Sequence, residues 1–138
     1  MKAISLLQPW ASLVVLGIKT IETRNWKTAY RGSILIHASQ GKAGSTFANE
    51  PPFKKYIPDY KKLSFGAIIG QATITNIFRI ERLEMPEELI NRLTMEEKAF
   101  GDYAEGRFAW MLEEAFVFDK PIPARGTLSI WEYPYIIL

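Results

Sequence analysis

The chain has 138 residues, a formal net charge of +2, one histidine and no cysteine. A chain of this length can bury a sizeable core without disulfides, so we expect a single domain over residues 1–138. The lack of cysteine excludes thiolate-bound zinc and iron–sulfur sites, and the single histidine, His37, argues against a multi-histidine metal site. We therefore predict neither a bound metal nor a cofactor.

Alternating apolar residues, with turn residues between them, predict short strands separated by a few short helices. Pro9 suits the start of the first helix and Gly17 its end. Residues 33–39 carry apolar side chains on both faces, which predicts a strand covered on both sides, as in a small barrel packed by helices. The expected strands lie at residues 1–7, 18–26, 33–39, 67–78, 108–118 and 127–131, and the expected helices at 10–16, 86–93 and 95–103.

Three further segments carry specific expectations. Residues 40–64 are rich in glycine, proline and lysine, which is typical of a long connection that serves as a binding loop. Thr94 and Glu97 have the spacing of a capping box at the start of a helix. Strict alternation over residues 108–118 would place Phe108, Trp110, Leu112, Phe116 and Phe118 on one face.

The amino-terminal residues do not predict a targeting or membrane segment. Lys2 precedes an apolar run, but Gln8 and Pro9 interrupt it early, and no stretch approaches the roughly 20 apolar residues that span a bilayer. We expect a cytoplasmic protein with no membrane partner.

Charge is distributed unevenly along the chain. Residues 1–62 contain ten Lys and Arg against three acids, whereas residues 63–138 contain seven against twelve. A basic amino-terminal half can form a positive surface that attracts phosphates. Folding can equally mix the two halves and leave no such patch.

The polar residues best suited to chemistry lie between Lys19 and Trp26. On an ideal strand Glu22, Arg24 and Trp26 face the same way, while Lys19 sits at a junction where a turn can redirect it. Arginine grips phosphate or carboxylate, tryptophan stacks on a base, and a Glu–Lys pair can transfer protons or stabilise an oxyanion. The same pattern also fits an exposed strand face with a surface ion pair.

Several motifs resemble the ASCH domain, the activating-signal-cointegrator homology family, which is related to the PUA RNA-binding domains. They are the run Gln8-Pro9-Trp10-Ala11-Ser12, the pattern Gly17-x-Lys19-x-x-Glu22-x-Arg24-x-Trp26, Tyr30-Arg31-Gly32, Phe108-Ala109-Trp110 and the ending Pro121-Ile122-Pro123…Gly126…Trp131. The resemblance implies an α+β fold, a PUA-like mixed β-barrel flanked by short helices, with a cleft that receives the motif residues. It also implies work on RNA or on a nucleotide-like ligand.

One departure from the family bears on catalysis. Short amidohydrolases of this family have a Lys–Thr–x–Thr–x–Arg run in which the second threonine is the proposed nucleophile. Here Glu22 occupies that position, so the resemblance carries over Lys19 but not the nucleophile.

Two main hypotheses follow. In the first, the chain binds single-stranded RNA or a nucleotide-like molecule. The ligand-binding residues would then be Gln8, Trp10, Ser12, Arg24, Trp26, Arg31, His37 and Ser39, and the phosphate contacts would be Lys42, Lys54, Lys55, Lys61 and Lys62. In the second, it is a small hydrolase, a ribonuclease or nucleoside amidohydrolase, with Lys19 and Glu22 as catalytic residues. His37 suits either a general base or a histidine bonded within the core. A protein partner is a third reading, which predicts an exposed apolar patch.

Overall fold

A computed structural model describes residues 1–137. Their elements are short except for two long strands, β4 and β5. In chain order they are β1 (Lys2–Leu6), α1 (Trp10–Val15), β2 (Ile21–Arg24), β3 (Gly32–Ala38), the 3-10 turn η1 (Phe47–Asn49), α2 (Phe53–Tyr56), the 3-10 turn η2 (Tyr60–Lys62), β4 (Ala67–Arg79), α3 (Glu87–Arg92), α4 (Met95–Phe100), β5 (Phe108–Pro123) and β6 (Ile130–Glu132).

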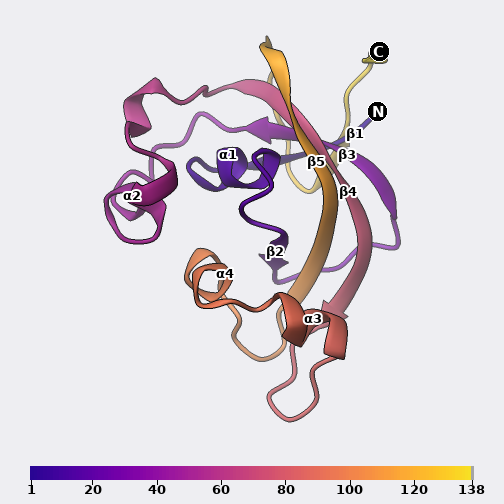
Figure 1. Cartoon of the computed structure of the whole chain (residues 1–138). Coiled ribbons are helices and arrows are strands. Elements are labelled where there is room, and N and C mark those ends of the chain that lie inside the picture. Colours follow the sequence, from indigo (N-terminus) through magenta and orange to yellow (C-terminus); the bar gives the residue numbers. More distant parts are fainter. Residues whose placement is uncertain (138) are drawn as a thin grey trace.

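The six strands form one mixed sheet in the order β2-β5-β4-β3-β1-β6. Strands β1 and β3 pair in parallel, and the other neighbours are antiparallel. The long strands β4 and β5 bend the sheet into a half-barrel around α1 (Figure 1). Ile137, the last described residue, lies beside Met1. The predicted α+β class, with a curled mixed sheet and short flanking helices, is therefore confirmed.

Strand β3 is covered on both faces, as its sequence predicts. Ile34 and Ile36 pack in the same cluster as Val14 of α1. Leu35, which points the other way, packs with Ile68 of β4 in a second cluster. Burial on both faces fixes the position of β3, and with it the end of the parallel strand β1 beside it.

The capping-box expectation is met only in part. The Thr94 hydroxyl accepts from the Glu97 backbone N–H at 3.0 Å, which caps α4. The Glu97 carboxylate does not complete the box but accepts from the backbone N–H groups of Thr20 and Ile21, both at 3.1 Å. Glu97 thus attaches α4 to the start of β2, because those two N–H groups need a buried acceptor.

The strict alternation predicted for β5 fails in its second half. The register against β4 shifts between Gln71 and Thr73 and again between Ile68 and Gly70, and Glu114 has φ of 52°. These irregularities reorient the strand, and Phe116 is 49% exposed.

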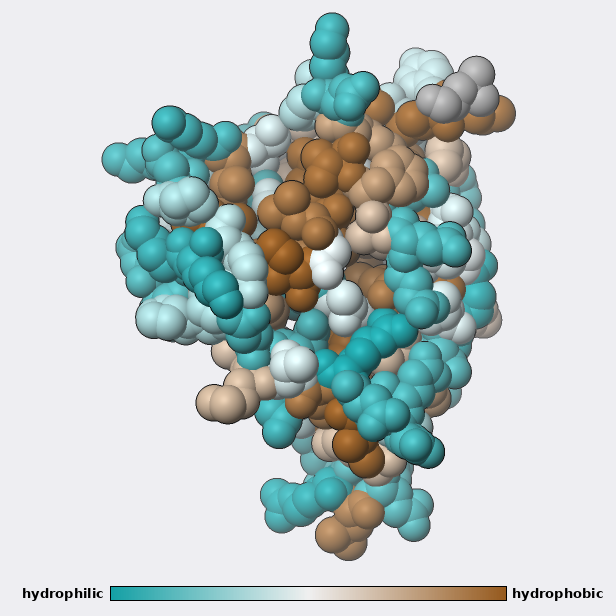
Figure 2. Space-filling view, in the orientation of Figure 1, coloured by the Kyte–Doolittle hydropathy of each residue, from teal (hydrophilic) through white to brown (hydrophobic). Residues whose placement is uncertain are grey.

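Apolar side chains gather on the face shown in Figure 2, between hydrophilic margins and over the space between α1 and β5. A groove of about 340 Å³ lies there, with Val15 and Leu16 on one side and Val117 and Phe118 on the other. The helices of residues 1–137 are all too short or too polar to span a bilayer.

We expect Glu97→Ala to lower the free energy of unfolding by roughly 2–4 kcal/mol, because each buried N–H group left without an acceptor costs about 1–3 kcal/mol. Urea denaturation measures this change. The matched control is Glu88→Ala on the neighbouring helix α3, where the glutamate is exposed. Removing an exposed carboxylate changes the free energy of unfolding by less than about 1 kcal/mol, so equal losses from the two variants would contradict the structure.

Candidate functional site

A polar cavity of about 600 Å³ opens where the end of β1 faces β2 across the curl of the sheet. Aromatic and charged side chains form parts of its wall, and small polar and aliphatic residues form the rest. The lining includes Ser5, Trp10, Glu22, Arg24, Trp26, Ser39, Phe47, Phe100, Asp102 and Arg107.

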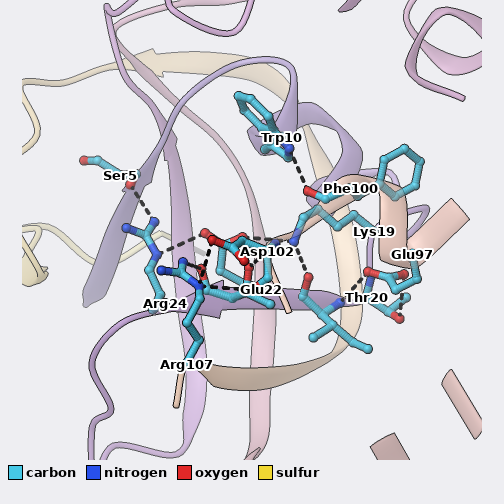
Figure 3. Close-up of polar contacts among 12 residues, drawn as sticks. Ser5, Trp10, Lys19, Thr20, Glu22, Arg24, Glu97, Phe100, Asp102 and Arg107 are labelled. Atoms are coloured by element: carbon cyan, nitrogen blue, oxygen red, sulfur yellow. Dashed lines mark hydrogen bonds and ion pairs between the residues drawn. The ribbon is translucent and has the colours of Figure 1, made fainter. Parts of the chain in front are cut away.

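A chain of three charged side chains runs along one side of this cavity (Figure 3). The Lys19 ammonium is 1% exposed and donates to the Ile21 carbonyl and, at 3.0 Å, to Glu22 Oε1. Glu22 Oε2 lies 3.0 Å from Arg24 Nε as an ion pair. Arg24 Nη2 then donates to the Ser5 carbonyl at 3.2 Å.

This arrangement joins two strands that are not neighbours in the sheet. Strand β2, which carries Glu22 and Arg24, is at one edge, whereas β1, which carries Ser5, is next to the other edge. The contact from Arg24 to Ser5 therefore spans the open side of the half-barrel. Since Glu22 pairs with Trp110 on β5, its carboxylate lies over the apolar interior of the curl, beside Ile4 and Leu6.

Burial raises the pKa of Glu22, but the neighbouring Lys19 and Arg24 cations outweigh that effect and hold the pKa below its ordinary value. Glu22 is 13% exposed and therefore presents a charged carboxylate to the cavity at neutral pH. Such a carboxylate accepts hydrogen bonds well and is a weak base. Burial raises the pKa of Glu97, which lies behind the cavity, against the opposing effect of the Thr20 and Ile21 N–H groups and Lys19.

Another part of the rim, beside β2, comes from the turn between α4 and β5 (Figure 3). Arg107 donates to the Asp102 carbonyl at 3.1 Å through Nε and to the Thr23 carbonyl at 3.2 Å through Nη2. The Asp102 backbone N–H donates to the Thr23 hydroxyl at 3.1 Å. These contacts follow from the pairing of β2 with β5, which puts Arg24 opposite Phe108 and so brings Arg107 to the cavity.

The aromatic wall is held from several elements. Trp10 Nε1 donates to the Phe100 carbonyl at 2.8 Å, and the Trp10 ring centroid lies 5.2 Å from that of Phe47. Trp26 packs edge-on against Trp110, with centroids 4.9 Å apart. Phe47 is 43% exposed, so part of its ring faces solvent.

The structure brings five of the sequence-predicted residues together in the cavity lining: Trp10, Glu22, Arg24, Trp26 and Ser39. Lys19 contacts this group from behind, with its ammonium covered by Glu22. Phe47, Asp102 and Arg107 were not singled out from sequence. Phe47 does fall in the segment predicted to be a binding loop, but the residues around Asp102 and Arg107 carry no comparable signal.

Four other predicted residues lie elsewhere. Gln8 is buried and holds the Ser64 carbonyl and the Ser12 backbone N–H, at 3.0 and 2.9 Å. Ser12 lines the apolar groove beside α1. Arg31 donates to backbone carbonyls of its own turn, and His37 lies on the far side of β1 and β3, bonded to Ser5 Oγ at 2.9 Å.

The five lysines predicted to contact phosphates all lie within residues 42–62, outside the cavity lining. In the described part of the chain, none of them lines the cavity: Lys42, Lys54, Lys55, Lys61 and Lys62 are all exposed. Four of them lie close to other groups. Lys42 Nζ lies 3.0 Å from the Phe65 ring centroid, and Lys54 donates to the Pro58 carbonyl at 2.9 Å. Lys55 pairs with Glu96 at 3.4 Å and Lys62 with Asp59 at 4.0 Å.

The lowered pKa of Glu22 has a consequence for stability. A depressed carboxyl pKa stabilises the folded state at pH values above the unfolded pKa, and this contribution is lost as the pH falls through the folded value. We expect Glu22→Gln to lower the free energy of unfolding by roughly 3 kcal/mol at pH 7, near the lower end of the loss for a broken buried pair. The difference in unfolding free energy between the variant and wild type should become smaller below about pH 4.

Urea denaturation at pH 7 and pH 3.5 measures this difference in unfolding free energy at each pH. Glu105→Gln, an exposed carboxylate, serves as the control and should change little at either pH. A gap for Glu22→Gln that stays constant with pH would show that Glu22 is not held as a charged group.

Comparison with known proteins agrees with this architecture. The ASCH domain model matches residues 4–122. Activating signal cointegrator 1 from Homo sapiens is 51% identical over 39 residues, and that from Mus musculus is 53% identical over 36. These matches cover 28% and 26% of this chain but only 7% and 6% of the two relatives.

A solved structure supports the fold. The crystal structure of ASCH from Zymomonas mobilis is similar with a TM-score of 0.50 and 22% identity, over 88% of this chain and 71% of that chain. At this identity the likeness concerns the fold alone, and it agrees with the α+β, PUA-like expectation. Since the family match extends over most of its length, the chain belongs to the ASCH domain family.

Proposed function

We propose that this chain binds single-stranded RNA or a nucleotide-like molecule, with one base held in the polar cavity. The observation that carries the proposal is the combination of aromatic walls with an ionised Glu22–Arg24 pair in a hollow of about 600 Å³. That volume lies within the range of small-molecule sites, and bases bind to proteins by stacking on aromatic rings and by hydrogen bonds to their edges. Membership of the ASCH family is consistent with an RNA ligand.

The charge of the lining favours a base over a phosphate inside the cavity. Its charged residues are two carboxylates, Glu22 and Asp102, and two arginines, Arg24 and Arg107. A phosphate meets no net positive charge in this lining and would be repelled by the Glu22 carboxylate. An amino group or ring N–H of a base, in contrast, can donate to that carboxylate, while Arg24 can donate to a ring nitrogen or carbonyl.

The phosphates of the same strand would then lie outside the cavity. The exposed lysines of α2 and η2 are the proposed contacts: Lys54, Lys55, Lys61 and Lys62, with Lys42 nearby in sequence. Helix α2 packs beside η1, which supplies Phe47 to the cavity, so a strand leaving the cavity past Phe47 would reach these lysines.

The hydrolase alternative gains no support from this site. Lys19 donates to Ile21 and Glu22 and is covered by protein, so its ammonium does not face the cavity. Glu22 has a lowered pKa, which makes it a poor general base. We therefore propose binding, with Glu22 and Lys19 as parts of the binding surface and its support.

We expect Phe47→Ala to weaken binding of a single-stranded RNA by roughly 5- to 150-fold, because a stacked base contributes about 1–3 kcal/mol. A fluorescence titration measures the affinity. Phe116→Ala is the matched control: Phe116 is also about half exposed, at 49% against 43% for Phe47, but does not line the cavity. Equal effects of the two substitutions, or no binding by wild type, would contradict the proposal.

Replacing two of the exposed lysines should weaken the dependence of RNA affinity on salt concentration. Each phosphate contact adds about 0.7 to the slope of log affinity against log salt for a single strand, so Lys54→Ala with Lys61→Ala should reduce the slope by about 1.4. Filter binding at several salt concentrations measures it, with the exposed Lys120→Ala as control. An unchanged slope would place the phosphates elsewhere on the protein.

A further inference from the structure

A second cavity, of about 820 Å³, lies beside the first. It is formed between the ends of β1 and β3 and the segment that joins β5 to β6. Ser5 and Ser39 line both cavities, so the two share a wall. A ligand of two nucleotides would therefore have one nucleotide on each side of these two serines.

The shared wall is fixed by a hydrogen-bond network. Trp131 Nε1 donates to Ser5 Oγ at 3.1 Å. The Ala124 carbonyl, 2.7 Å from His37 Nε2, can only accept, which assigns the proton of the neutral imidazole to Nε2. In this tautomer His37 Nδ1 accepts from the Ser5 hydroxyl at 2.9 Å. His37 therefore ties the segment after β5 to strands β1 and β3.

Gly126 continues this attachment. A Cβ atom at Gly126 would lie 2.7 Å from the His37 ring and would also collide with Ser5 Oγ. The backbone of the segment thus rests directly on the Ser5–His37 pair, and only glycine permits this approach. The segment between β5 and β6, which bounds the second cavity, is therefore fixed to β1 and β3 by these contacts.

The second cavity differs from the first in charge. Within the described residues, its one formally charged lining side chain is Arg125, whereas acids and bases balance in the first cavity. Its lining also offers Thr127 and Gln40 for hydrogen bonds, and Leu128, which is 91% exposed, as an apolar surface. A cation beside polar groups and an apolar side chain suits a nucleotide with its phosphate.

We propose that the second cavity is the subsite for the neighbouring nucleotide of a bound single strand, with Arg125 at the linking phosphate and Leu128 against the base. This inference rests on the proposed function of the first cavity. It deepens that function, because it makes the preferred ligand a strand of at least two nucleotides rather than a free nucleoside or mononucleotide.

The test compares ribonucleoside monophosphates with the corresponding dinucleotides by isothermal titration calorimetry on the full chain. We expect the dinucleotides to bind roughly 10- to 150-fold more tightly, as one charge-assisted contact between Arg125 and the linking phosphate would give. Arg125→Ala and Leu128→Ala should each remove most of this gain and leave the affinity for monophosphates unchanged.

Matched controls are available for both substitutions. Leu83 is 92% exposed, and Arg82 is an exposed arginine beside it; both lie outside the two cavities. Leu83→Ala and Arg82→Ala should keep the full gain from the second nucleotide. All four side chains are on the surface, so the variants are expected to fold.

The outcomes separate the two proposals. Monophosphate binding without a gain for dinucleotides, or a gain that survives both Arg125→Ala and Leu128→Ala, would overturn the second subsite and leave the first intact. Absence of binding by either ligand would overturn both. A gain that is lost in those two variants and kept in the controls would support the second subsite.

Discussion

The ion pairs of Glu22 with Lys19 and Arg24 are the interaction on which the rest of the site depends. They place a charged carboxylate over an apolar interior, where an unpaired charge would be strongly unfavourable. The two cations keep it ionised, and Arg24 extends the arrangement to the backbone of Ser5 across the open side of the sheet. The same contacts that stabilise the carboxylate therefore determine the shape of the cavity and the groups it presents.

The order of the three charged residues explains why they suit recognition better than catalysis. Lys19 lies deepest and is covered by protein, Glu22 lies between, and Arg24 is the most exposed. A buried ammonium with two protein acceptors supports its neighbour and does not reach a substrate. The groups that face the cavity are an acceptor and a forked donor, which together can read the edge of a base without transferring a proton.

Alternation along β2 was enough to predict that Glu22 and Arg24 share a face, because side chains two residues apart on a strand point the same way. The position of Lys19 could not be predicted, since it depends on how the chain turns after α1 at Gly17, whose φ is +74°. Arg107 and Asp102 reach the site only through the long-range pairing of β2 with β5, which leaves no local pattern. Gln8 belongs to a conspicuous motif, yet its side chain hydrogen-bonds the backbone of Ser12 and Ser64. Sequence alone does not distinguish a polar side chain that binds a ligand from one that binds the protein backbone.

The most direct test of the account uses the indole N–H signals of the four tryptophans in a two-dimensional ¹⁵N–¹H NMR titration with a ribonucleoside monophosphate. Trp10 and Trp26 line the first cavity, whereas Trp131 lies behind Ser5 on the other side of the wall. We expect the Trp10 and Trp26 signals to shift as the ligand is added and the Trp131 signal to stay in place. Shifts confined to Trp131, or no shift of Trp10 and Trp26 at saturating ligand, would contradict a base-binding cavity built on the Glu22 ion pairs.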